Sequence, residues 1–128
     1  MSSEYSCVFG ISTATPGLDP KDIHRTYGKG WSFLTIAGKG NKSYWFLYKK
    51  MDRIYYGSDI PRFNKADIDE HVAPYLDRPV SGSVNFSELY KRSTFRTFVA
   101  LEEANFNHWC IDRFACVGDS IHKVRPPV

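Results

Sequence analysis

Two neighbouring aromatic segments, joined by a short glycine-rich stretch, place the strongest constraint on how this chain folds. Segments 31–37 and 43–50 are rich in strand-forming residues, and the intervening Gly-Lys-Gly-Asn-Lys has the composition of a hairpin loop. Both segments carry large apolar side chains at odd and at even positions. Because alternate residues of a strand point to opposite faces, we expect both faces to be covered, one by helices and the other by a further layer such as a ligand.

The rest of the chain predicts a small α+β protein. We expect further strands over 4–12, 93–101 and 109–117, and helices over 19–27, 64–76 and from 85 or 87 to about 92. Pro20 suits the first turn of a helix, and Asn64 suits the residue that precedes one. Segment 51–63 is predicted to be a loop or an edge segment, and 102–107 to be irregular. Since repeated βαβ units are lacking, we expect a single domain over 1–128 with a mixed or antiparallel sheet of about five strands and two or three helices.

Composition limits the class of partner. The net charge is only +3 and the two signs are interspersed, which argues against a nucleic-acid-binding groove. No stretch approaches the roughly 20 apolar residues of a membrane span, and the first ten residues do not resemble a signal peptide. Cys7, Cys110 and Cys116 are expected to be buried free thiols, so a cytoplasmic protein is predicted. An aromatic content of 16% favours a pocket for an apolar ligand or a buried partner surface.

Other kinds of site are disfavoured by residue spacing. None of the four histidines has the spacing of metal ligands, so no metal is expected. Segment 38–43 superficially resembles a phosphate-binding loop, but a strand follows it where a helix is required. The chain also lacks the Gly-x-Ser-x-Gly motif of a nucleophile elbow.

The end of the chain carries a recognisable motif. Arg113-Phe-Ala-Cys-Val-Gly-Asp-Ser-Ile-His-Lys-Val-Arg-Pro has a strand-like run that ends at Gly118-Asp119-Ser120, and strand ends commonly contact ligands. This segment resembles the "GD" motif of class A FAD-dependent monooxygenases, above all the fungal enzymes of meroterpenoid and indole-diterpene pathways. Four upstream segments and Trp109 resemble the middle, substrate-covering region of that family in the same order. The four segments are Val8-Phe-Gly-Ile-Ser, Tyr44-Trp-Phe-Leu, Asp59-Ile-Pro-Arg-Phe and Leu101-Glu-Glu.

The resemblance implies a sheet that presents an apolar face to a bulky polyketide or terpenoid substrate. In the family, the aspartate at the position of Asp119 contacts the flavin. The family's N-terminal Gly-x-Gly-x-x-Gly domain has no counterpart here, and Pro126-Pro127-Val128 stands where the motif would continue. The resemblance therefore implies a truncated relative that binds no cofactor, in which Asp119 is a relic of a flavin contact.

These inferences predict a cofactor-independent cyclase or isomerase of fungal secondary metabolism. Its substrate would be a hydrophobic polyketide or terpenoid intermediate, and an intramolecular Diels–Alder-type cycloaddition is one candidate reaction. Confinement in a reactive conformer can lower such barriers by about 7–11 kcal/mol. The alternative is a non-catalytic binding module, either a homodimer or the partner of a flavoprotein. The residues expected to line the substrate cavity are Trp31, Phe33, Tyr44, Trp45, Phe46 and Trp109. The residues expected to act as catalytic donors are His24, Arg25, Tyr48 and His108.

Overall fold

The fold is seen in a computed structural model that describes residues 1–124, so Pro126-Pro127-Val128 lie outside the described residues. Its strands are β1 (Ser2–Ser12), β2 (Ile23–Gly28), β3 (Trp31–Ala37), β4 (Ser43–Tyr56), β5 (Ser93–Asn105), β6 (Cys110–Ile111), β7 (Phe114–Ala115) and β8 (His122–Lys123). Its α-helices are α1 (Ala66–Val72) and α2 (Phe86–Lys91), and short 3-10 helices span Gly57–Asp59, Ala73–Tyr75 and Gly118–Ser120.

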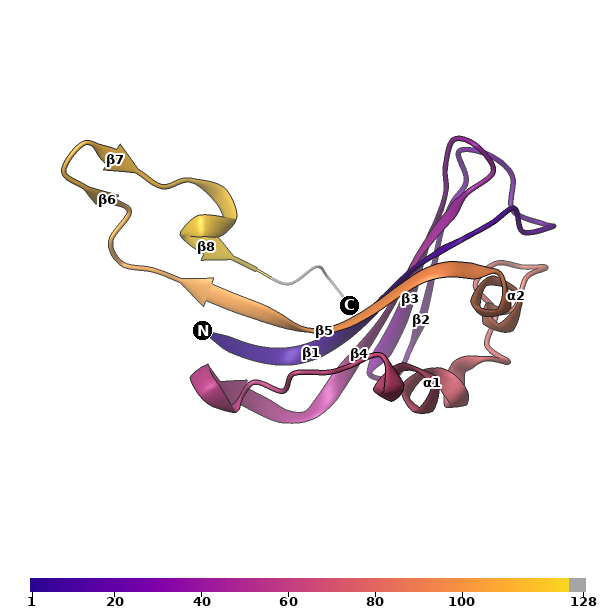
Figure 1. Ribbon diagram of the computed structural model, residues 1–128, viewed down its shortest axis with the longest axis horizontal. Helices are drawn as coiled ribbons and strands as arrows, with labels where there is room; N and C mark the ends of the chain where they lie inside the picture. The colour runs from indigo at the N-terminus through magenta and orange to yellow at the C-terminus, as the bar shows by residue number, and fades with distance from the viewer. Residues whose placement is uncertain (125–128) are drawn as a thin grey trace.

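The main sheet of the described chain is antiparallel throughout, with the order β2-β3-β4-β1-β5-β8 (Figure 1). The central strand β1 pairs with β4 on one side and with β5 on the other, so that Val8 lies between Leu47 and Phe98. This arrangement confirms the predicted α+β class with an antiparallel sheet and few helices. The hairpin of segments 31–37 and 43–50 is also confirmed, although β4 continues to Tyr56.

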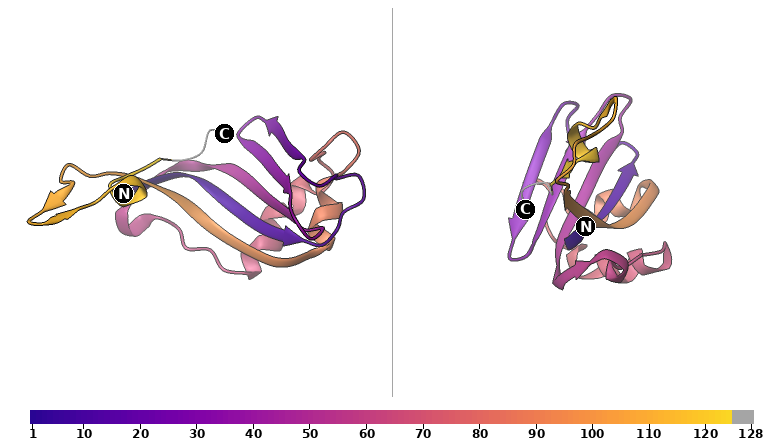
Figure 2. Two further views of the ribbon diagram at one scale, coloured as in Figure 1. Left: turned by 90° about the horizontal axis from the view of Figure 1, so that it is seen from above. Right: turned by 90° about the vertical axis from the view of Figure 1, so that its left-hand side faces the viewer.

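Both α-helices lie on the same side of the sheet (Figures 1 and 2). The alternation along the strands sends Val8, Leu47 and Phe33 to this side, where they are almost completely buried. The core between sheet and helices consists of Val8, Phe33, Trp45, Leu47, Ile68, Val72, Val80, Val84, Phe86, Leu89 and Phe98. Neither α-helix of residues 1–124 therefore packs on the opposite face of the sheet.

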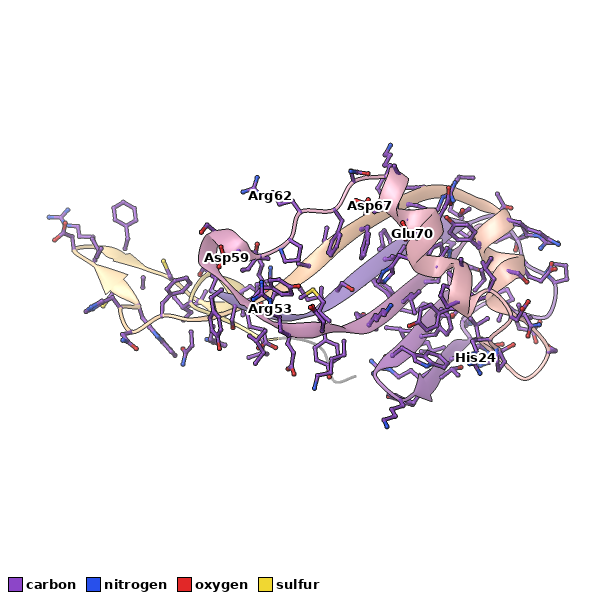
Figure 3. All side chains as sticks on the ribbon, turned by 90° about the horizontal axis from the view of Figure 1, so that it is seen from below. His24, Arg53, Asp59, Arg62, Asp67 and Glu70 are labelled. Atoms are coloured by element: carbon purple, nitrogen blue, oxygen red, sulfur yellow. The ribbon has the colours of Figure 1, made fainter. Side chains whose placement is uncertain are left out.

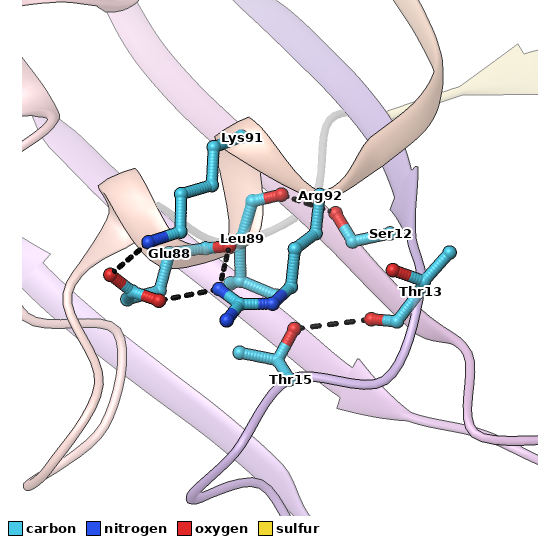
Figure 4. A network of polar contacts seen from close by, with 7 residues as sticks. All are labelled: Ser12, Thr13, Thr15, Glu88, Leu89, Lys91 and Arg92. Atoms are coloured by element: carbon cyan, nitrogen blue, oxygen red, sulfur yellow. Dashed lines mark hydrogen bonds and ion pairs between the residues drawn. The ribbon is translucent and has the colours of Figure 1, made fainter.

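The helical side is tied to β1 by buried polar contacts. The Trp45 indole donates to Ser12 Oγ at 2.9 Å. That hydroxyl in turn donates to the Leu89 carbonyl at 2.6 Å (Figure 4). Next to it, Glu88 forms ion pairs with Lys91 and Arg92 within and just beyond α2. The buried indole N–H is thus satisfied, which matters because an unpaired buried donor is costly.

The helix predicted over 19–27 is wrong. Residues 19–22 form a turn, closed by the bond from the Asp22 amide to the Asp19 carbonyl at 3.1 Å, and β2 follows. Ile23, Thr26 and Tyr27 favour strands, and the edge of β3 offers them backbone partners. Tertiary pairing therefore overrides the helix-start signal of Pro20.

The predicted C-terminal strand over 109–117 is also wrong. This segment folds into a two-stranded hairpin, β6 and β7, that projects beyond the end of β5 (Figure 1). Asp112 adopts a φ of 51° in the turn, a conformation that tight hairpin turns require and that aspartate tolerates. Cys110 and Cys116 are exposed on this hairpin, which corrects the expectation that all three thiols are buried; only Cys7 is. The predicted irregular segment 102–107 is largely strand, since β5 reaches Asn105.

Candidate functional site

One side of the sheet faces away from α1 and α2 (Figure 2). The strand register places mostly apolar side chains on this side, which we call the open face. The register of β2, β3, β4, β1 and β5 arranges its side chains in three rows that cross the strands. The rows are Tyr27-Ser32-Tyr48-Cys7-Val99, Arg25-Leu34-Phe46-Phe9-Thr97 and Ile23-Ile36-Tyr44-Ile11-Phe95. None of these residues is acidic.

Aromatic rings form the centre of the open face. Phe46 packs against Phe9 with ring centroids 4.9 Å apart and stacks nearly parallel to Tyr48 at 5.9 Å. At the margins, Ile23 is 65% exposed and Phe95 is 49% exposed. A contiguous apolar surface of this kind is uncommon on a protein that has no partner for it, and it suits a flat or bulky apolar molecule.

A cluster of hydrogen-bond donors lies at one corner of the open face. The Arg25 guanidinium donates from Nη1 to the Tyr27 hydroxyl at 3.4 Å. Burial raises the pKa of Tyr48 to about 12, and the neighbouring Cys7 raises this pKa as well, while the Arg25 charge lowers it. Tyr48 is therefore a neutral phenol at pH 7. Within residues 1–124 no ion pair joins Arg25 to a carboxylate. Arg25 and Tyr27 are exposed while Tyr48 is only 7% exposed, so this corner offers an acceptor oxygen chiefly the N–H groups of Arg25 and the Tyr27 hydroxyl.

The structure divides the predicted substrate-binding residues between the two faces. Tyr44 and Phe46 lie on the open face. Phe33 and Trp45 are 1% and 0% exposed and pack against Phe86 in the core, so they have no surface available to a ligand. Trp31 is on the same side as Phe33, against which it packs. The expectation that Phe33 and Trp45 line a substrate cavity is therefore corrected, and the half-buried Trp31 lies on the same helix-covered face.

The predicted donors are also separated. Arg25 and Tyr48 lie together on the open face, but His24 points to the opposite side of β2, with Nε2 3.5 Å from Asp22 Oδ2 (Figure 3). His108 is exposed in the segment between β5 and β6. His24 and His108 therefore do not join the cluster at Arg25. Adjacent residues of a strand point to opposite faces, which places His24 on the other side of β2, and His108 lies beyond β5 near the projecting hairpin.

Trp109 stands apart from the open face as well. It is 51% exposed, packs against His122 at 5.6 Å and donates from its indole to the Phe106 carbonyl at 2.8 Å. These contacts fold the segment beyond β5 onto itself. Trp109 thus belongs to the base of the C-terminal hairpin and not to the three rows of the open face.

Several residues of the open face were not predicted as site residues. Phe9 and Ile11 supply the β1 part of the surface, and Leu34 supplies the β3 part. The alternation of Tyr5, Cys7, Phe9 and Ile11 in segment 4–12 was a usable signal for the β1 residues.

A flavin does not fit the described residues by themselves. Asp119 lies in the exposed 3-10 turn Gly118–Ser120, where Ser120 donates to the Val117 carbonyl. One exposed carboxylate in a projecting segment cannot enclose an isoalloxazine or hold a pyrophosphate. No group of three or more potential metal ligands occurs among the residues described. A search of the described helices finds none long and apolar enough to cross a membrane.

Comparison with known proteins places the chain beside fungal flavoproteins. It is 46% identical over 126 residues to the FAD-dependent monooxygenase BOA8 of Botryotinia fuckeliana and 42% identical over 129 residues to the FAD-dependent monooxygenase anuJ of Penicillium roqueforti. It is 40% identical over 126 residues to the FAD-dependent monooxygenase spyC of Aspergillus fumigatus. Each alignment covers 98% of this chain, but only 16% of the first two relatives and 26% of the third.

The chain is therefore similar, along nearly all of its length, to one segment of proteins named FAD-dependent monooxygenases. It spans between about a sixth and a quarter of their length. No protein-family model matches the chain, and no solved structure matches it. Assignment to class A and the flavin-contacting role of the Gly118-Asp119 motif stay predictions.

Proposed function

We propose that the open face is one wall of a binding site for a bulky, largely apolar organic molecule in an active site of the FAD-dependent monooxygenase type. The observation that carries this proposal is that α1 and α2 do not cover the three rows of the open face, whose centre holds Phe9, Phe46 and Tyr44. Burial of apolar surface contributes about 25 cal/mol per Å², so a ligand that removed about 200 Å² of this face from water would gain about 5 kcal/mol. The costs of association reduce that gain, which makes closure by a second wall important.

The relatives support the flavin part of the proposal only through their names and their greater length. On this proposal, the described residues bind and orient the substrate, and the flavin is held by protein outside these 128 residues. That protein is either a further part of a longer chain or a partner flavoprotein.

Orientation of the substrate would come from the donor cluster. Tyr48 and Arg25 can each donate to a carbonyl or enolate oxygen, and no acidic side chain in the three rows competes for them. An acceptor oxygen that entered this corner would place the apolar body of the molecule over Phe46. The resemblance to the fungal enzymes favours a polyketide or terpenoid with a conjugated carbonyl.

The test uses testosterone, a bulky apolar molecule with a conjugated ketone, in equilibrium dialysis. Replacement of Phe46 by serine should weaken binding about tenfold, since the loss of one ring contact costs roughly 1.5 kcal/mol. Tyr56→Ser is the matched control, because Tyr56 is an aromatic residue of the same strand that is 64% exposed outside the three rows. Equal binding by Phe46→Ser and by the unmodified protein would refute the proposal.

The alternative is the cofactor-independent cyclase or isomerase predicted above, acting on the same face. The pairing of a neutral Tyr48 phenol with the Arg25 charge favours it, since these donors could activate a conjugated carbonyl toward cyclisation. The substrate would then have to be enclosed, for example by a second copy of the chain. Conversion of a polyene ketone by the purified protein without flavin, lost in Tyr48→Phe, would support this alternative. Absence of conversion with every such substrate would leave only the binding role.

A further inference from the structure

A groove lies on the helical side of the sheet, opposite to the open face. After β4, the chain turns at Gly57–Asp59 and runs back along the sheet to α1, carrying Asp59 and Arg62 as it goes (Figure 3). The Gly57 amide donates to the Met1 carbonyl at 3.1 Å, and the Phe63 ring stacks on Phe98 with centroids 3.8 Å apart. These two contacts fix the returning segment, and a groove of about 510 Å³ remains between it and β4.

Apolar side chains line the groove on both of its walls. Met51 and Tyr55 contribute from β4, and Pro61 and Phe63 contribute from the returning segment. His71 of α1 completes it, with its ring 4.3 Å from the ring of Phe98. Burial, assisted by the nearby charge of Lys49, lowers the pKa of His71 to about 4, so the imidazole is neutral at pH 7. The volume lies within the range of small-molecule sites, which is about 300–1,000 Å³.

Two polar features of the groove call for a partner. The Lys49 ammonium lies 5.7 Å from the centre of the Tyr75 ring and forms no ion pair with a carboxylate in the described part of the chain. The buried His71 Nε2 also has no hydrogen-bond partner among the residues described. A buried polar atom of this kind usually has a bonding partner in a native structure. A ligand that reached Lys49 and His71 could supply one.

The charges around the groove favour an anion next to Lys49. Lys50 is paired with Glu4 at 3.0 Å, and Asp52 accepts a hydrogen bond from Tyr55 at 2.7 Å. The carboxylates of Asp67 and Glu70 line an adjoining depression that shares Lys49, Phe63 and His71 with the groove. Asp52 also lies on the β4 wall, so a ligand carboxylate would be repelled from α1 and from Asp52 and drawn toward the Lys49 ammonium. Of the two lysines that line the groove, Lys50 is paired with Glu4, which leaves Lys49 to the ligand.

We propose that this groove binds a small organic acid with a flat apolar body, whose ring packs against Phe63 and Tyr55 and whose carboxylate accepts from Lys49. The site uses the face of the sheet opposite to Arg25 and Tyr48, so it is independent of the function proposed for the open face. The two sites would allow one sheet to hold two different small molecules.

The test is titration of the 128-residue protein with 2-naphthoate, followed by naphthalene fluorescence and by NMR of the amide signals. Lys49→Gln should weaken binding about tenfold, as expected for the loss of a charge-assisted hydrogen bond. Lys49→Arg should retain most of the affinity. Lys42→Gln, in the exposed loop between β3 and β4, is the matched control and should bind like the unmodified protein. Uncharged 2-naphthalenemethanol should bind at least tenfold more weakly than 2-naphthoate.

Three outcomes would overturn the proposal. The first is unchanged affinity in Lys49→Gln, provided that its thermal unfolding shows it to be folded. The second is loss of binding in Arg25→Gln, which would place the acid on the open face. The third is a set of shifted amide signals that excludes Phe63 and His71. Failure of testosterone binding would concern the open face alone and would leave this groove untouched.

Discussion

Gly10 and Trp45 lie opposite each other across the β1–β4 pairing, and the indole ring occupies the place that a side chain on residue 10 would need. A β-carbon on Gly10 would lie 2.0 Å from Cζ2 of Trp45. The Trp45 ring has little room to move, because it is fully buried against Phe86 and hydrogen-bonded to Ser12. The absence of a side chain at residue 10 thus permits a tryptophan in the core.

The first prediction follows from this contact. Gly10→Ala should lower the free energy of unfolding by about 3 kcal/mol, the upper end of the range for overpacked cores. Urea unfolding followed by tryptophan fluorescence measures the change. Gly82→Ala is the control, since no atom lies within 4 Å of the β-carbon that it would add. Equal stability of the two variants would show that the core adapts to the extra atom.

Ser12 provides a second prediction. Ser12→Ala removes the acceptor of the Trp45 indole N–H and leaves this buried donor without a partner. We expect a loss of about 2 kcal/mol in the free energy of unfolding, because the desolvation of the donor is no longer compensated. Ser58→Ala, at an exposed position beyond β4, should change the value by less than about 0.5 kcal/mol in the same urea titration. A normal unfolding midpoint for Ser12→Ala would contradict the prediction.

The thiols should differ in reactivity. Burial raises the pKa of Cys7 to about 12, so its reactive thiolate is scarce at pH 8. Cys110 and Cys116 are exposed. Iodoacetamide should therefore modify these two in the folded protein, and Cys7 only after denaturation. Peptide mass spectrometry after timed alkylation measures this order, and early modification of Cys7 would show that β1 is accessible.

His71 should make stability depend on pH. Its pKa falls from an ordinary 6.5 to about 4 on folding, so between these values the unfolded chain binds more protons than the folded protein. The contribution of His71 to the free energy of unfolding is therefore fully present above about pH 6.5 and is lost as the pH falls toward 4. After allowance for solvent screening at this half-buried ring, we expect a loss of about 1 kcal/mol. Urea midpoints at pH 7 and pH 4.5 measure it, and His71→Phe should reduce the difference.

Tyr48 offers a prediction on selectivity at the open face. Tyr48→Phe removes the hydroxyl but keeps the ring that stacks on Phe46. Binding of a steroid ketone should weaken about fivefold, a typical loss for one neutral hydrogen bond, while binding of the corresponding hydrocarbon should not change. Equilibrium dialysis of both compounds provides the comparison. Equal losses for the two would mean that the hydroxyl does not contact the ketone.

Much of the architecture could be predicted from local patterns. Strand-forming residues on both sides of Gly-Lys-Gly-Asn-Lys indicated the β3–β4 hairpin, and the apolar spacing of Ile68 and Val72 indicated α1. These signals are local, since propensity and periodicity act within a few residues. Residues 19–27 were misjudged because Pro20 resembles a helix start, whereas the free edge of β3 favours a strand.

The candidate site depended on long-range arrangement. The sequence by itself determined that Trp45 and Phe46 point to opposite faces, because adjacent residues of a strand always do. It also determined that both faces carry large apolar groups. Only the tertiary structure decided which face is core, because α1 and α2 pack over Trp45 and leave Phe46 uncovered. The register of the strands then placed Arg25 and Tyr48 on the same face and His24 on the other, an arrangement that no local pattern in the chain encodes.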